Sequence, residues 1–261
     1  AALKKIDQQK AQLGLKAVIA FPAKEKWVTG LHLSNVAFSQ EFGDVLTAFK
    51  AGDVEFKYGD MLKTLVDLQA EYAYQPAGTR SSLNAVDYST QVEELFSLEQ
   101  VAVIQQGNWV HGSIASMDEE LAQNIGILPI PLKGVVEDSI PVGVPMYWAV
   151  NNKKEKVEKD AAKDFLNWLY TSQEGKEMII NDFKFIPALS GYDQLTPSDP
   201  LASDIIKYSE AGKTMSWVFM GYPSGWGENV LGANIQAYLA GDITWKELEE
   251  NCQVEWRNAR K

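Results

Sequence analysis

Three tryptophans lie in short loop segments that also contain glycine. Trp27 lies in KWVTG, Trp109 ends the sequence GNW, and Trp226 has a glycine on either side in SGWGE. An indole ring beside glycine at a strand end can present its flat apolar face to a ligand, and the C–H face of a pyranose ring stacks on such a surface. We therefore predict that these three rings converge on one crevice that binds a sugar.

Polar residues stand close to each of these tryptophans in the sequence. Glu25 shares a loop with Trp27, Asn108 and His111 flank Trp109, and Glu228 follows Trp226. Carboxylate, amide and imidazole groups form hydrogen bonds with hydroxyls. The candidate ligand-binding residues are therefore Trp109, Trp27, Trp226, Glu25, Asn108, His111 and Glu228.

The other five tryptophans do not share this loop setting. Trp168, Trp245 and Trp256 lie in amphipathic segments, where we expect them to pack against other helices. Trp148 and Trp217 can be interpreted either way, because Trp148 alternates with Met146 and Val150 on one face of a predicted strand.

Motifs of catalysis are missing from the sequence. His32 and His111 form neither an H-x-x-x-H nor an H-E-x-x-H pattern, and no G-x-S-x-G, G-x-x-x-x-G-K-[ST] or G-x-G-x-x-G sequence occurs. Neighbouring acidic pairs such as Glu119 and Glu120 would point about 100° apart on a helix, which suits a solvated face better than a glycosidase pair. We expect no enzymatic activity, no metal and no cofactor.

Composition excludes several other classes of protein. The 24 basic and 35 acidic side chains give a net charge of -11, which disfavours nucleic acid as a partner. No stretch is apolar enough for a membrane span. The single cysteine, Cys252, cannot form an internal disulfide, and we expect it to be a buried, unreactive thiol.

Periodicity and turn signals predict an alternation of strands and helices, and hence an α/β fold. We predict strands over residues 16–21, 101–105, 125–130 and 144–150, and helices over residues 60–74, 92–96, 154–170 and 201–211. Thr171 with Glu174 and Thr244 with Glu247 fit capping boxes, and Gly241 fits a helix end.

Several segments resemble the bacterial carbohydrate solute-binding proteins of ATP-driven importers, the family of maltose-binding protein. VAVIQQGNW over residues 101–109 is similar to the family's strand and turn that end in tryptophan, and IGILPIP over residues 125–131 is similar to its next strand. AVNNKKEKVEKDAAKDFLNWLYTSQEGKEM over residues 149–178 resembles the family's characteristic helix pair. The resemblance places aromatic loop residues of the family at Trp109 and Trp226. It places an acidic residue followed by an aromatic one at Glu25 and Trp27.

The resemblance implies a two-lobe periplasmic-binding-protein-like fold in which a ligand is held between lobes that close about a hinge. Residues 1–136 and 197–261 are expected to form an essentially complete second lobe, and residues 137–196 part of the first. The family's N-terminal portion, roughly 120 residues, would be missing from this first lobe, through cleavage, deletion or another cause. We therefore expect the apolar stripe of residues 154–170 to lack a covering sheet and to be exposed.

The function implied by the resemblance is that of an extracytoplasmic sugar receptor, either periplasmic or lipid-anchored at the cell surface. Its partners would be a mono- or oligosaccharide and the membrane permease of an importer, with the receptor itself a monomer and a missing N-terminal fragment as a further partner. Two alternatives stay open. One is a glycan-active enzyme with the same aromatic surfaces, and the other is a binding protein for a non-sugar solute such as a polyamine or a peptide.

Overall fold

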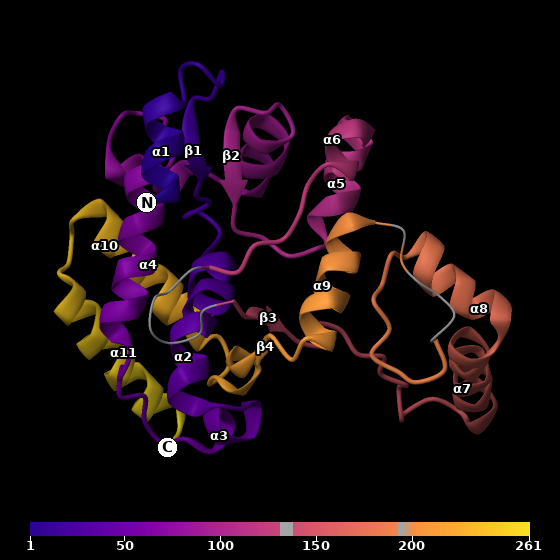
Figure 1. Cartoon of the computed structure of the whole chain (residues 1–261). Coiled ribbons are helices and arrows are strands. Elements are labelled where there is room, and N and C mark those ends of the chain that lie inside the picture. The colour runs from indigo at the N-terminus through magenta and orange to yellow at the C-terminus, as the bar shows by residue number, and fades with distance from the viewer. Residues whose placement is uncertain (131–137, 193–196, 198) are drawn as a thin grey trace.

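The computed structural model describes residues 1–130, 138–192, 197 and 199–261 (Figure 1). Figure 1 shows a main body that contains both chain termini and a smaller group of helices, α7 and α8, on the far side of α9. Most elements are helical, and the strands are short. None of the described helices is long and apolar enough to cross a bilayer.

Two parallel strands anchor the main body. β1 (Ala17–Ala20) pairs with β2 (Val101–Ile104), with Ala17 opposite Val101 and Ala20 opposite Ile104. Residue Ala73, which follows α4 (Gly59–Tyr72), adds a parallel bridge to Ile19. The strands predicted over residues 16–21 and 101–105 are therefore confirmed, as is the helix predicted over residues 60–74.

The remaining elements of the main body are mostly helices, several of them with short π-helical turns. They comprise α1 (Ala2–Gln9), η1 (Val28–Leu33), α2 (Ser34–Phe42), α3 (Val45–Lys50), η2 (Arg80–Ala85), η3 (Thr90–Phe96), α5 (Val110–Met117), α6 (Glu119–Gln123), η5 (Val218–Gly221), η6 (Trp226–Gly232), α10 (Ala233–Ala240) and α11 (Trp245–Ala259). α9 (Pro200–Glu210) packs Leu201 into the apolar cluster formed by Val92, Val110 and Ile114.

A second parallel pair lies between the main body and α9 (Figure 1). β3 (Ile140–Val142) pairs with β4 (Thr214–Ser216). The predicted lobe boundaries at residues 136/137 and 196/197 fall on or beside segments outside the described residues, so the division into lobes stays a prediction.

The smaller group of helices has its own apolar cluster. α7 (Lys156–Thr171), α8 (Gln173–Glu177) and η4 (Met178–Asp182) enclose Leu169, Ile179, Ile180 and Tyr192. Of the apolar stripe of α7 only Leu169 is buried, whereas Val157, Phe165 and Trp168 are exposed. The stripe that was expected to lack a covering sheet is thus open to solvent in this structure.

Two predicted strands are wrong within the described residues. Residues 125–130 form no strand, because the backbone N–H of Ile127 is bound by the Asp204 carboxylate of α9 (3.1 Å) instead of a neighbouring strand. Residues 144–150 also form no strand, and Met146, Tyr147 and Trp148 are exposed. Alternation of apolar residues marks an extended chain but does not provide the partner that makes it a strand.

Helix ends follow the sequence signals with one shift. Thr244 and Glu247 form the predicted capping box of α11, and Gly241 ends α10 in the left-handed conformation (φ 84°). Thr171 instead belongs to α7, where its hydroxyl donates to the Asn167 carbonyl (2.6 Å). Ser172 caps α8 in its place by accepting from the backbone N–H of Gly175 (3.0 Å).

Glycines allow η1 and η6 to lie against each other. A Cβ atom placed on Gly30 would lie 1.8 Å from the carbonyl oxygen of Gly227, and one on Gly232 would lie 2.7 Å from the Lys26 carbonyl oxygen. Real atoms cannot approach this closely, so the contact depends on the absence of side chains. It holds the Trp27 loop against the segment that contains Trp226.

We predict that Gly30→Ala lowers the free energy of unfolding by at least about 2 kcal/mol, because a rigid backbone carbonyl blocks the added methyl group. Urea denaturation measures the change. Gly52→Ala is the matched control, since a Cβ there has no atom within 4 Å. Equal stability of the two variants would contradict the proposed close packing.

Candidate functional site

Two of the three predicted tryptophans meet at the carboxyl ends of β1 and β2. Trp27 precedes η1 after β1, and Trp109 precedes α5 after β2. Because the strands are parallel, their following loops emerge at the same edge of the sheet. The two indole rings are tilted by 55°, with their centroids 6.0 Å apart, and Trp109 is 39% exposed.

His32 lies between these rings and two further aromatic side chains. Its ring centroid is 5.5 Å from that of Trp27 and 5.3 Å from that of Trp109. It is also 5.2 Å from the ring of Trp217 and 4.8 Å from that of Phe219. We call these five side chains the aromatic cluster. His32 was not among the predicted site residues, because its neighbours in the sequence, Leu31 and Leu33, are apolar and only the fold brings it to Trp109.

Trp217 connects the aromatic cluster to the β3–β4 pair. It follows β4, and its ring lies directly over Gly143, which follows β3. A Cβ atom on Gly143 would lie only 2.6 Å from the ring atom Cδ2 of Trp217. Trp217, whose role the sequence left open, therefore lies at the rim of the candidate site.

Trp226 does not join the aromatic cluster. Its ring is 1% exposed and packs edge-on against Trp256, with centroids 4.8 Å apart. Its indole N–H donates to the Cys252 carbonyl (3.0 Å) in the main core. The prediction that Trp226 contacts ligand is wrong for this structure, because α11 and Tyr222 cover both the ring and its polar atom.

The predicted polar residues fall into three settings. Glu25 lies beside the cluster, where its carboxylate accepts from the Trp27 indole N–H (3.0 Å) and from the backbone N–H of Tyr88 (3.1 Å). Asn108 is partly buried in the turn before Trp109, and Glu228 is exposed on η6. His111 is buried, so a ligand cannot reach it without a rearrangement of α5.

The aromatic surroundings keep the His32 ring uncharged. Burial lowers the pKa of His32 from its ordinary value of 6.5 to about 4, because a charged imidazolium loses hydration among apolar rings. Nearby, Lys24 pairs with Asp87 (3.0 Å). Hydrogen bonding by the Thr90 backbone, followed by this ion pair, lowers the pKa of Asp87 to about 2. At neutral pH the cluster therefore offers an uncharged aromatic surface.

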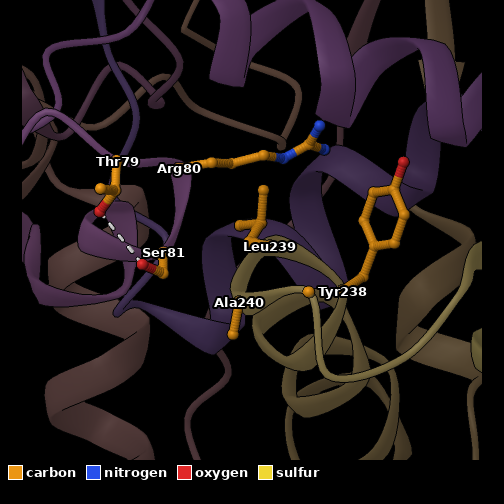
Figure 2. Close-up of a pocket in the computed structure, with 7 residues that line it drawn as sticks. Thr79, Arg80, Ser81, Tyr238, Leu239 and Ala240 are labelled. Carbon is orange, nitrogen blue, oxygen red and sulfur yellow. Dashed lines mark hydrogen bonds between the residues drawn. The ribbon is translucent and has the colours of Figure 1, made fainter.

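Cavities also lie away from the aromatic cluster. One of about 380 Å³ is lined by Thr79, Arg80, Ser81 and residues 238–241 (Figure 2). Arg80, the charged residue of this lining, already has partners. It pairs with the Asp67 carboxylate, which also accepts from the Tyr238 hydroxyl (2.9 Å), and its guanidinium lies 4.8 Å from the centre of the Tyr238 ring. We interpret this network as one that fixes η2 against α10. Within the described residues, no group of three acidic, histidine or cysteine side chains could hold a metal ion.

The depressed pKa of His32 predicts a loss of stability on acidification. The unfolded chain binds a proton at His32 below about pH 6.5 and the folded chain only below about pH 4, so the free energy of unfolding falls as the pH drops between these values. We expect His32→Phe, which keeps an aromatic ring, to remove about 2 kcal/mol of this loss between pH 7.5 and 4.5. Urea denaturation of both proteins at the two pH values tests this, and parallel losses would contradict it.

No curated protein matches the chain in sequence. Two solved structures share its fold: a chitin oligosaccharide binding protein (TM-score 0.71, 19% identity) and the binding protein MsmE of Bacillus subtilis subsp. subtilis strain 168 in an open conformation (TM-score 0.63, 17% identity). Each match covers 99% of this chain but 63% of the other, so the chain spans less than two thirds of their length.

These similarities confirm the predicted periplasmic-binding-protein-like fold and agree with the family resemblance of the sequence. The sequence model for bacterial extracellular solute-binding proteins matches residues 1–237, which is most of the chain. Members of that family work outside the cytoplasm. The chain therefore belongs to the family of bacterial extracellular solute-binding proteins.

Proposed function

We propose that this chain is part of a receptor that captures a mono- or oligosaccharide between two lobes and delivers it to the permease of an ABC importer. The observation that carries the proposal is the convergence of Trp27 and Trp109 beside His32. The receptor acts as a monomer in this proposal, and its ligand leaves chemically unchanged.

The hydrogen bonds of the two indoles favour contact through their faces. The N–H group of Trp27 donates to Glu25 (3.0 Å), and that of Trp109 donates to Gln106 (3.1 Å). With both N–H groups engaged by neighbours in their own loops, each ring offers its π face to a ligand. Pyranose rings have apolar C–H faces that suit this contact.

The charge state of the cluster favours a neutral ligand over the cationic alternatives. His32 is uncharged at neutral pH, and the Glu25 carboxylate already accepts two hydrogen bonds. A polyamine needs several carboxylates close together, and the rings provide none. The overall charge of -11 is distributed over the whole chain and does not define a cation site.

Two further observations support capture between lobes. Trp217 packs on Gly143, next to the β3–β4 pair that lies between the main body and α9, so the aromatic cluster adjoins the connection between the two parts of the fold. In addition, one protein of the same fold is described as binding chitin oligosaccharides, which are neutral sugars.

We predict that Trp109→Ala weakens sugar binding by about 1 to 3 kcal/mol with little loss of stability, because the ring is substantially exposed and its face is the contact surface. A thermal-shift screen of glucose, maltotriose, cellobiose and N,N′-diacetylchitobiose selects the ligand, and calorimetric titration then measures affinity.

Trp148→Ala is the matched control, since that indole is 60% exposed but belongs to the segment before α7. Unchanged affinity in Trp109→Ala would remove Trp109 from the site. Chromatography of each sugar after incubation tests the enzymatic alternative, and the appearance of hydrolysis products would exclude a simple receptor.

A further inference from the structure

We propose that Gln91 and Gln106 are positioning residues that fix the Trp109 ring for its ligand, an inference that rests on the proposed function. Three hydrogen bonds connect the ring to the sheet. The Trp109 indole N–H donates to Gln106 Oε1 (3.1 Å), and Gln106 Nε2 donates to Gln91 Oε1 (2.7 Å). Gln91 Nε2 then donates to the carbonyl oxygen of Ala20 at the end of β1 (2.8 Å).

The groups at the two ends of this series of hydrogen bonds determine the orientation of both amides. A backbone carbonyl can only accept a hydrogen bond, and an indole N–H can only donate one. Each glutamine must therefore turn its NH₂ group toward Ala20 and its oxygen toward Trp109. A flip of either amide would place two donors or two acceptors opposite each other, so the chain has one satisfied arrangement.

Burial fixes Gln91, the inner member of this series of hydrogen bonds. Gln91 is fully buried, as is Ala20, and a buried amide is costly unless its polar atoms are bonded. Gln106 is partly buried and Trp109 is the exposed end. The exposed Trp109 ring is thus connected through Gln106 and Gln91 to the buried end of β1.

Gly107 holds the ring from a second side. A Cβ atom on Gly107 would lie 2.1 Å from the ring atom Cζ3 of Trp109, so the indole rests directly on the glycine backbone. The hydrogen bond at Nε1 and the contact at Cζ3 act on different edges of the ring. Together they restrict rotation about both side-chain torsions.

This restriction has a direct consequence for binding. A freely rotating aromatic side chain loses conformational entropy when a ligand orders it, whereas a ring that is already held does not. Loss of the hydrogen bonds made by Gln106 and Gln91 should therefore reduce affinity even though neither glutamine stacks on the sugar.

Gln106→Met tests the inference, because methionine keeps the length of the side chain and removes both hydrogen bonds. We expect an affinity loss of about three- to tenfold for the sugar selected by thermal shift. In protein labelled with 5-fluorotryptophan, the ¹⁹F resonance of Trp109, assigned by its absence in Trp109→Phe, should move or broaden in Gln106→Met.

Gln105→Met is the matched control. Gln105 is the neighbouring residue and accepts a hydrogen bond from the buried Gln69 (2.9 Å), but it takes no part in the hydrogen bonds that connect Trp109 to Gln106 and Gln91. This variant should lose stability without a change in the Trp109 resonance or in affinity. It separates a general weakening of the fold from loss of ring position.

The outcomes distinguish the inference from the function on which it rests. If Trp109→Ala weakens binding but Gln106→Met changes neither affinity nor the Trp109 resonance, the positioning role is wrong and the proposed function stands. A moved resonance with unchanged affinity also overturns the positioning role. Unchanged affinity in Trp109→Ala, or no binding of any of the four sugars, overturns both.

Discussion

The parallel pairing of β1 with β2 is the constraint on which the candidate site depends. These strands are 80 residues apart in the sequence, yet their register places Ala20 opposite Ile104 at one edge of the sheet. The loops that follow them must leave at this edge because parallel strands point in the same direction. Trp27 and Trp109 become neighbours for this reason, although neither holds the other in place by a hydrogen bond.

The same arrangement recurs in the second strand pair. β3 and β4 are also parallel, and the residues that follow them, Gly143 and Trp217, are in contact. The two pairs thus direct their following segments to a common region, where His32 contacts rings from both. An imidazole in this position provides an aromatic surface that is polar at its edge but carries no charge at neutral pH. This combination suits a ligand with apolar faces and hydroxyl edges.

Trp27 and Trp109 differ from Trp226 and Trp256 in the partner of the indole N–H. In Trp27 and Trp109 this group is bound by side chains of the same loop, which leaves the ring at the surface. In Trp226 and Trp256 it is bound by backbone carbonyls of distant segments, at Cys252 and at Ala51, which draws the ring into the core. Flanking glycines cannot distinguish these cases, since glycine serves close helix packing at Gly227 and support of a ring at Gly107.

The sequence by itself determined the features that depend on local interactions. The apolar runs of β1 and β2, the capping box of Thr244 and Glu247, and the burial of Cys252 all follow from residue type and spacing. The family was also evident from the sequence. Tertiary structure alone decided which rings meet, because the burial of Trp226 depends on α11, and the surroundings of His32 depend on three distant side chains, Trp109, Trp217 and Phe219. It likewise decided that residues 125–130 form no strand among the described elements, since a strand exists only where another backbone completes its hydrogen bonds.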